Sequence, residues 1–359
     1  MPGPRPRPPD GYFFEDYAVG DRLVHATPRT LTAADAALYV ALTGSRNPVH
    51  CAEPVARAMG HPCAPLDDLL VFHAAFGKTV HDISFNAVAN LGYADVRFLE
   101  PVYPGDTIAC ESEVIGLKQN SSGQNGNVTV RSRALNQHGR EVLSWIRWVM
   151  VRKRDPASPA PATVQPDLPK EVPASRLAVP AFLKAGRLDP RATGGARLWD
   201  DYRPGEVIDH PGGQTIEEAD HMLATRLWQN TARIHFDAFA ARATPSGRRL
   251  VYGGHVMSLA RALQHDGLEN AFGIAAFHAG THANPSFAGD TIFARTVVTA
   301  ADGVRGRDDV GALRVRLLAH KDAAHADVPV PAPGERHPAV VLDLDLTLLM
   351  PRRGPPRLE

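Results

Sequence analysis

The sequence contains few cysteines, no long apolar run and no excess of charge, and each absence narrows the class of protein. Only three of its 359 residues are cysteine, at positions 51, 63 and 110, and no Cys-x-x-Cys pair occurs. Three cysteines cannot build a disulfide framework, so we expect a reducing, cytoplasmic location. No segment is long and apolar enough to cross a membrane, and the proline-rich N-terminus lacks the apolar centre of a signal peptide.

The charge balance excludes classes of partner. The 39 basic and 39 acidic residues cancel, which removes the electrostatic basis for binding nucleic acid or an anionic membrane. An apolar content of 44% and a charged content of 22% are typical of soluble globular proteins. A chain of 359 residues exceeds one ordinary hydrophobic core, so two domains are expected.

What the chain does contain is an internal repeat. Similar segments recur at a nearly constant offset of 185 or 184 positions, which is the signature of a tandem duplication. The pairs are 14–21 with 199–206, 31–35 with 216–220, His50 with His235, 101–108 with 285–292, and 145–154 with 344–353. We therefore expect a disordered tail at 1–10, a first domain at 11–154, a Pro/Ala-rich linker at 155–195 and a second domain at 196–353.

Each half has the same predicted order of elements. Apolar residues at helical spacing predict helices near residues 68–80 and 255–264, and several strands of alternating apolar and polar residues follow each helix. Helices that precede strands, without a β-α-β rhythm, indicate an α+β half in which an antiparallel sheet wraps round a central helix.

At this point the motifs resemble a known family. Gly44–His50, with the sequence Gly-Ser-Arg-Asn-Pro-Val-His, is similar to the hydratase 2 motif of MaoC-like enoyl-CoA hydratases, and Pro101–Thr107 is similar to their strand entry. Longer strings, such as Ala89–Tyr93, Gln229–Arg233 and Val251–His255, resemble the mesaconyl-CoA hydratase (β-methylmalyl-CoA dehydratase) family. This resemblance implies a tandem double hot-dog fold, with two antiparallel sheets each wrapped round a central helix.

The resemblance also implies a reaction, the reversible syn hydration of the double bond of a 2-enoyl-CoA thioester. The expected case is mesaconyl-CoA and water giving β-methylmalyl-CoA, with coenzyme A as part of the substrate and with no metal or redox cofactor. In the family an aspartate and a histidine of the motif activate water together. This chain departs from that pattern, because the aspartate position holds Ser45 in the first half and Asn230 in the second.

The physics of the reaction favours the second half as the active one. Negative charge develops on the thioester oxygen, and a backbone N–H at the start of a helix can stabilise it. The second half offers Gly253 and Gly254 at a helix start, whereas the first half has Asp67 and Asp68 there, which would repel an enolate. We expect His235 to act as general base.

The remaining roles follow from that choice. Asn230 would hold the water and the Gly254 N–H would bind the thioester oxygen. We expect Gly253, His255 and Arg233 to bind substrate, with His255 or Arg233 as candidates for its second carboxylate. A second or vestigial site in the first half would comprise His50, Asn47 and Ser45.

Alternatives stay open at this level. Asp237 could replace the missing motif carboxylate. An acyl-CoA thioesterase could use Asp67 or Asp68 to activate water, and the absent aspartate is compatible with a non-catalytic acyl-CoA binding protein. His61, Cys63 and His73 lack the spacing of a metal site. Two fused hot-dog units already form a pseudo-dimer, so a further homodimer is an expectation only.

Overall fold

The strands of both halves join into one antiparallel sheet. The structure, a computed structural model, describes residues 8–332 and 334–353. Within them the strand order is β1-β3-β4-β5-β2-β8-β11-β10-β9-β6, and β7 pairs with β9. The strands are β1 (Arg22–Thr30), β2 (Ala87–Phe98), β3 (Thr107–Gln119), β4 (Asn125–Leu135), β5 (Glu141–Arg152), β6 (Val207–Asp209), β7 (Gln214–Thr215), β8 (Gly273–Thr281), β9 (Thr291–Gly303), β10 (Val310–Lys321) and β11 (Val340–Pro351).

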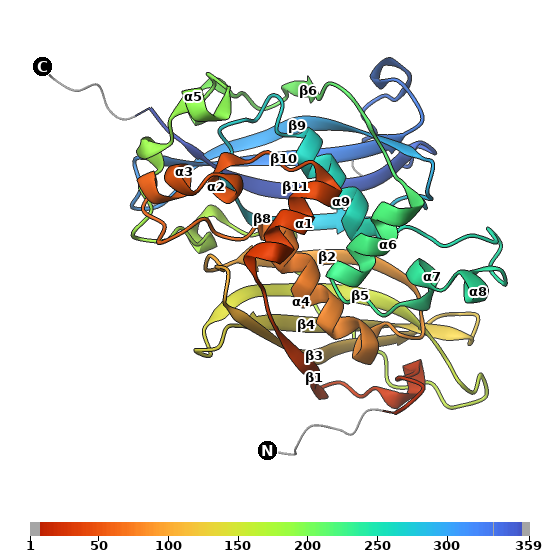
Figure 1. Ribbon diagram of the computed structural model, residues 1–359. Helices are drawn as coiled ribbons and strands as arrows, with labels where there is room; N and C mark the ends of the chain where they lie inside the picture. Colours follow the sequence, from red (N-terminus) through yellow and green to blue (C-terminus); the bar gives the residue numbers. More distant parts are fainter. Residues whose placement is uncertain (1–7, 333, 354–359) are drawn as a thin grey trace, which may run out of the picture.

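The two half-sheets meet edge to edge through β2 and β8, where Tyr93 lies opposite Gly280. Figure 1 shows the sheet of the N-terminal half below and that of the C-terminal half above, each with a helix across it. The predicted α+β double hot-dog fold is confirmed. The predicted tail lies mostly outside the described residues.

The helices repeat the plan of the strands. The central helices are α4 (Asp68–Ile83) and α9 (Gly253–Leu263). The others are α1 (Ala33–Thr43), α2 (Pro48–Cys51), α3 (Glu53–Ala58), α5 (Pro190–Thr193), α6 (Glu218–Leu227), α7 (Arg233–Phe236) and α8 (Ala238–Ala241), with 3-10 turns at Phe14–Asp16, Ala174–Arg176, Ala185–Arg187, Trp199–Asp201 and His325–Asp327. No helix in the described part of the chain has the length and apolar character needed to cross a membrane.

The two central helices pack against each other as well as against their sheets. Fourteen of the sixteen residues of α4 are buried, so this helix is enclosed on all sides. Phe72 of α4 packs edge-on against Phe277 of β8, with 5.4 Å between the ring centroids. The Nε2 atom of His73 lies 3.0 Å from Ser258 Oγ in α9. One hydrophobic core therefore extends through both halves, and fully burying one such aromatic ring contributes roughly 1.5–3 kcal/mol.

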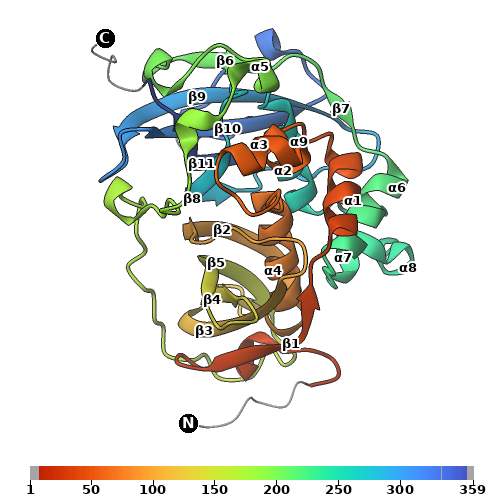
Figure 2. The same cartoon turned by 60° about the vertical axis from the view of Figure 1, so that its left-hand side comes forward.

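The segment 155–195 connects the two halves along the side of the molecule (Figure 2). It first pairs with the N-terminal sheet, where Val164 and Leu117 exchange backbone hydrogen bonds of 2.9 Å. It then buries Leu183 and Leu188 in a cluster that also contains Val310 of β10. These contacts attach the connecting segment to both sheets. The domain limits given above stay a prediction.

Candidate active site

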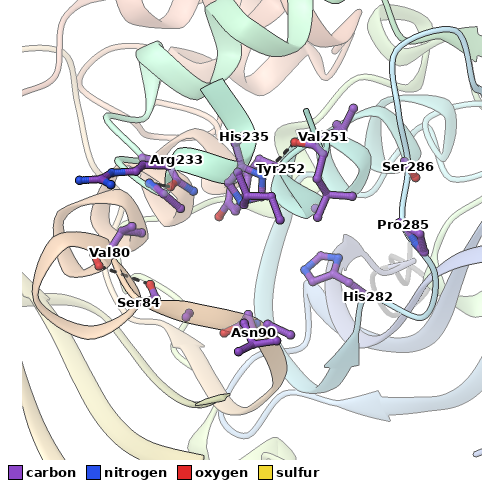
Figure 3. Close-up of a pocket in the computed structure, with 18 of the residues that line it drawn as sticks. Val80, Ser84, Asn90, Arg233, His235, Val251, Tyr252, His282, Pro285 and Ser286 are labelled. Atoms are coloured by element: carbon purple, nitrogen blue, oxygen red, sulfur yellow. Dashed lines mark hydrogen bonds between the residues drawn. The ribbon is translucent and has the colours of Figure 1, made fainter. Parts of the chain in front are cut away.

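A cavity of about 510 Å³ lies between the two halves. The N-terminal half contributes walls from α4, β2 and β5, and the C-terminal half contributes α7, the start of α9 and the segment after β8. Figure 3 shows His235 and Tyr252 across the cavity from Asn90, with His282 beside them. Because both halves line the cavity, neither half contains a complete site.

His235 is held in one orientation by the backbone. Its Nδ1 lies 2.9 Å from the carbonyl oxygen of Leu250, and since a carbonyl can only accept, Nδ1 carries the ring proton. Nε2 is then the unprotonated nitrogen. The ring lies deep in the protein but keeps part of its surface open to the cavity. Burial lowers the pKa of His235 to about 4, so the ring is neutral near pH 7 and able to accept a proton.

Asn230 also lines the cavity, and a backbone contact fixes its amide. Its Oδ1 accepts the N–H of Ala232 at 3.0 Å. This contact uses the carbonyl end of the amide, so the NH₂ group is the end that can donate to a ligand in the cavity. An amide held in this way can donate to a water oxygen but cannot take its proton.

Helix α9 begins with two free backbone donors. Its N-cap residue, Tyr252, makes no capping hydrogen bond with its side chain, and the N–H groups of Gly253 and Gly254 have no acceptor within the described residues. Gly253 lines the cavity, whereas Gly254 is buried and is not among the lining residues. A Cβ at position 253 would lie 2.4 Å from His282 Nδ1, so the close packing of the histidine requires glycine there.

The other predicted substrate residues lie in different surroundings. Arg233 is exposed at the mouth of the cavity, with its guanidinium 4.8 Å from the centre of the Phe85 ring. His255 is buried near Trp228 and is not among the residues that line the cavity. Burial lowers the pKa of His255 to about 3. Asp237 accepts the N–H of Ala240 at 2.9 Å as the cap of α8, which engages the carboxylate considered as a replacement for the motif aspartate.

Sequence reasoning missed part of the cavity wall. His282 lies at the end of β8, and its Nε2 is 3.1 Å from the hydroxyl of Tyr93 on β2. Its Nδ1 is buried without a partner, and burial, with His235 nearby, lowers the pKa of His282 to about 4. Asn90 and Arg147 also line the cavity. The internal repeat held a signal for them, because each occupies a position that is apolar in the other half.

The equivalent site in the N-terminal half has the same scaffold and is closed. His50 Nδ1 lies 3.1 Å from the carbonyl of Pro65, as His235 does from Leu250. The larger of two cavities that touch His50 measures only about 70 Å³. Asp67 Oδ1 accepts the Leu69 N–H at 2.9 Å, which is the donor equivalent to Gly254 N–H.

Further contacts complete that closure. Ser45 donates to Asp67 Oδ2 at 3.2 Å, and Asp68 accepts the Ile274 N–H at 2.7 Å. Burial raises the pKa of Asp68 to about 6. Asn47 caps α2 through the Val49 N–H, and its amide donates to the Ala271 carbonyl. The groups that a substrate would need are therefore bound to the protein itself.

The fold and the cavity define a class of protein, the MaoC-like dehydratases of double hot-dog architecture. The structure of a MaoC domain dehydratase from Chloroflexus aurantiacus matches with a TM-score of 0.94 and 55% sequence identity, covering 98% of this chain and all of that one.

Within that class the sequence identifies the family. Residues 8–338 match the family of mesaconyl-CoA hydratase. Beta-methylmalyl-CoA dehydratase of C. aurantiacus is 56% identical over 345 residues, which is 96% of this chain and 98% of that protein. Mesaconyl-CoA hydratase of Cereibacter sphaeroides is 54% identical over 343 residues, 95% of this chain and 98% of that protein. The chain belongs to the mesaconyl-CoA hydratase family, as the motifs predicted.

Proposed function

We propose that this protein is a hydro-lyase that reversibly hydrates mesaconyl-CoA to β-methylmalyl-CoA in the cavity between its two halves. The observation that carries the proposal is the neutral His235, oriented by Leu250 and facing a cavity of about 510 Å³ in which the start of α9 offers unbound N–H groups. The family to which the chain belongs supports the same reaction.

The proposed mechanism uses His235 twice. Its Nε2 removes a proton from water while the water oxygen bonds to the β-carbon of the enoyl thioester, and the π electrons move towards the thioester carbonyl. The N–H groups at the start of α9 bind the resulting enolate oxygen, an interaction for which loss of one donor costs about 3 kcal/mol in other enzymes. His235 then delivers the proton to the α-carbon, so the elements of water add to one face.

Asn230 has a supporting role in this scheme. Its NH₂ group donates a hydrogen bond to the water oxygen and leaves one water proton directed at His235, while the other stays on the oxygen and becomes the proton of the product hydroxyl. The usual aspartate would share the proton, whereas the amide only positions the oxygen. A single general base therefore carries the acid–base chemistry.

Loss of the enoyl-thioester absorbance of mesaconyl-CoA on addition of purified protein tests the proposal. We expect turnover without release of free thiol. Thiol release would instead identify a thioesterase, and binding without turnover would identify an acyl-CoA binding protein. The thioesterase alternative relied on Asp67 and Asp68, and both carboxylates are engaged in hydrogen bonds at the closed site.

The proposal also covers cofactors, oligomeric state and location in the cell. Addition of water requires no change of oxidation state, so we propose that no redox cofactor takes part, and the family resemblance leads us to propose that no metal does either. Dialysis against a chelator should leave the rate unchanged. A homodimer and a cytoplasmic location stay predictions, and light scattering of the purified protein tests the first.

A further inference from the structure

The charged residues around the cavity all carry the same sign. Three arginines line it, Arg147, Arg152 and Arg233, and no aspartate or glutamate is among its lining residues. Arg152 and Arg233 are exposed, whereas Arg147 is fully buried. An anionic ligand can therefore meet one cation at the inner wall and two at the mouth, which matches an acyl-CoA whose acyl group also ends in a carboxylate.

Not all hydrogen-bond donors of Arg147 have a close partner. Its Nη2 donates to Thr79 Oγ1 at 2.9 Å, and both Nη atoms reach Ser84 Oγ only at 3.4 Å. Its Nε is buried without a partner. The guanidinium lies 4.2 Å from the centre of the Phe76 ring.

No carboxylate forms an ion pair with Arg147 among the residues that the structure describes. Burial lowers the pKa of Arg147 to about 10, so the side chain remains a cation near neutral pH. A buried cation without an anion is destabilising. The missing partner is therefore expected to be a ligand.

The internal repeat shows that the fold itself does not require an arginine at this position. Arg147 of β5 lies between Val130 of β4 and Tyr93 of β2. In the C-terminal half the strand position between the equivalent residues, Val315 and Phe277, holds Leu346, which is fully buried. A leucine thus satisfies the packing of the same sheet position.

A neighbouring position follows the same pattern. Asn90 of β2, opposite Val149, corresponds to Ile274 of β8, opposite Leu348. Both polar atoms of the Asn90 side chain are buried without a partner, and the residue lines the cavity. Two neighbouring positions on the wall of one cavity thus hold polar residues where the other half holds apolar ones, and each has hydrogen-bonding groups without a partner. This indicates a binding subsite rather than a packing requirement.

We propose that Arg147, with Ser84 and Asn90 beside it, binds the free carboxylate of the acyl group and makes the enzyme selective for enoyl thioesters with an anionic end. This inference rests on the proposed function and deepens it. A guanidinium can hold a carboxylate through two parallel hydrogen bonds. The contacts from Arg147 to Ser84 are long, so a carboxylate can take their place. In this proposal Arg147 takes the role for which the sequence suggested Arg233 or His255.

The test compares two substrates in two variants. Arg147→Leu installs the residue used by the other half, and Arg147→Lys keeps the charge without the planar pair of donors. The kcat/KM value is measured with mesaconyl-CoA and with an otherwise identical thioester in which a methyl group replaces the carboxylate. We expect Arg147→Leu to lower kcat/KM for mesaconyl-CoA by about 10²–10³-fold, with Arg147→Lys between it and wild type. For the neutral thioester kcat/KM stays unchanged or rises.

Arg352→Leu is a matched control. Arg352 also lies over an aromatic ring, 4.4 Å from the centre of Trp199, and also has a buried Nε without a partner. It is outside the cavity. This variant should keep the wild-type ratio of kcat/KM between the two substrates, because its arginine meets no part of the acyl group.

Two outcomes overturn the proposal. Equal losses for both substrates in Arg147→Leu would assign the arginine a structural role. Equal hydration of both substrates by the wild-type protein would show that the enzyme does not select for an anionic end. If Arg147→Leu does not fold, Arg147→Lys carries the same comparison. Failure of the proposed function is distinguishable, because the wild-type protein would then turn over neither thioester. Calorimetric affinities for mesaconyl-CoA and the neutral thioester would still test Arg147, with a selective loss for mesaconyl-CoA expected.

Discussion

In the N-terminal half the start of α4 is closed by carboxylates, whereas in the C-terminal half the start of α9 faces a cavity. Both halves hold a histidine against a backbone carbonyl, His50 against Pro65 and His235 against Leu250. They differ in the helix cap, because Asp67 occupies the Leu69 N–H while the N–H of Gly254 has no acceptor within the described residues. The fold thus repeats the histidine and the helix start, and we propose that the residues at the helix start decide which of the two can bind a substrate.

Both halves contribute residues to the open site, although they differ in sequence there. The open site lies at the C-terminal histidine, yet Asn90, Tyr93 and Arg147 of the N-terminal half form part of its wall. The closed half has therefore kept a role, since it provides polar groups where the C-terminal half has Ile274, Phe277 and Leu346. In the roles we propose, the C-terminal half of the chain binds the catalytic water and the N-terminal half binds the acyl group.

The largest expected effect separates the two histidines. His235→Ala should lower kcat by about 10²–10⁴-fold, because a positioned general base contributes that much. His50→Ala should change kcat far less, since its ring faces cavities of about 10 and 70 Å³. Steady-state hydration of mesaconyl-CoA by both variants checks this. Equal losses would refute the assignment of one active half.

A smaller effect on kcat is expected from adding a side chain at Gly253, the first residue of α9. Gly253→Ala places a Cβ 2.4 Å from His282 Nδ1 and should displace that ring from the cavity wall. A displacement of about 1 Å in an active site can cost about 10²-fold in rate. Gly186→Ala is the control, because a Cβ there meets no atom within 4 Å. An unchanged kcat in Gly253→Ala would argue against tight packing at the helix start.

The pH dependence of the reaction should reveal the buried base. Since burial lowers the pKa of His235 to about 4, the ring is unprotonated above that pH. The kcat/KM value for hydration should stay level from about pH 8 down to about pH 5 and fall tenfold per pH unit only below about pH 4. His235→Ala should remove that step. A fall centred near pH 6.5 would mean that His235 titrates as an exposed histidine does.

The smallest effect on rate is expected in the closed half. Asp67→Ala removes the cap of α4 and should destabilise the protein by about 1 kcal/mol, as loss of an N-cap does. Hydration activity should stay near the wild-type value, because Asp67 is not among the residues that line the larger cavity. Denaturant unfolding and the hydration assay measure the two effects. A large loss of activity with unchanged stability would contradict the division between the halves.

The sequence predicted the repeated plan, because local patterns carry it. Helices expected near 68–80 and 255–264 are found at Asp68–Ile83 and Gly253–Leu263. The alternation of apolar residues in β3 appears as alternating burial along the strand. The choice of the C-terminal half rested on the glycines at the helix start, and the cavity lies there.

The far wall of the cavity could not be derived in the same way. It depends on the edge-to-edge pairing of β2 with β8, a contact between residues about 180 positions apart that no local pattern specifies. His282 belongs to no motif, and Arg147 reads as one position of an alternating strand. Only comparison of each residue with its counterpart in the other half would have singled these positions out.

The number of acyl-CoA molecules bound per chain tests the central claim most directly. Calorimetric titration of the His235→Ala variant with mesaconyl-CoA measures that number without interference from turnover. One molecule per chain is the predicted result, because the cavity at His235 is large enough to hold an acyl group whereas the two cavities at His50 are not. Two equivalent molecules per chain would show that the site at His50 also opens and would contradict the account of one working half.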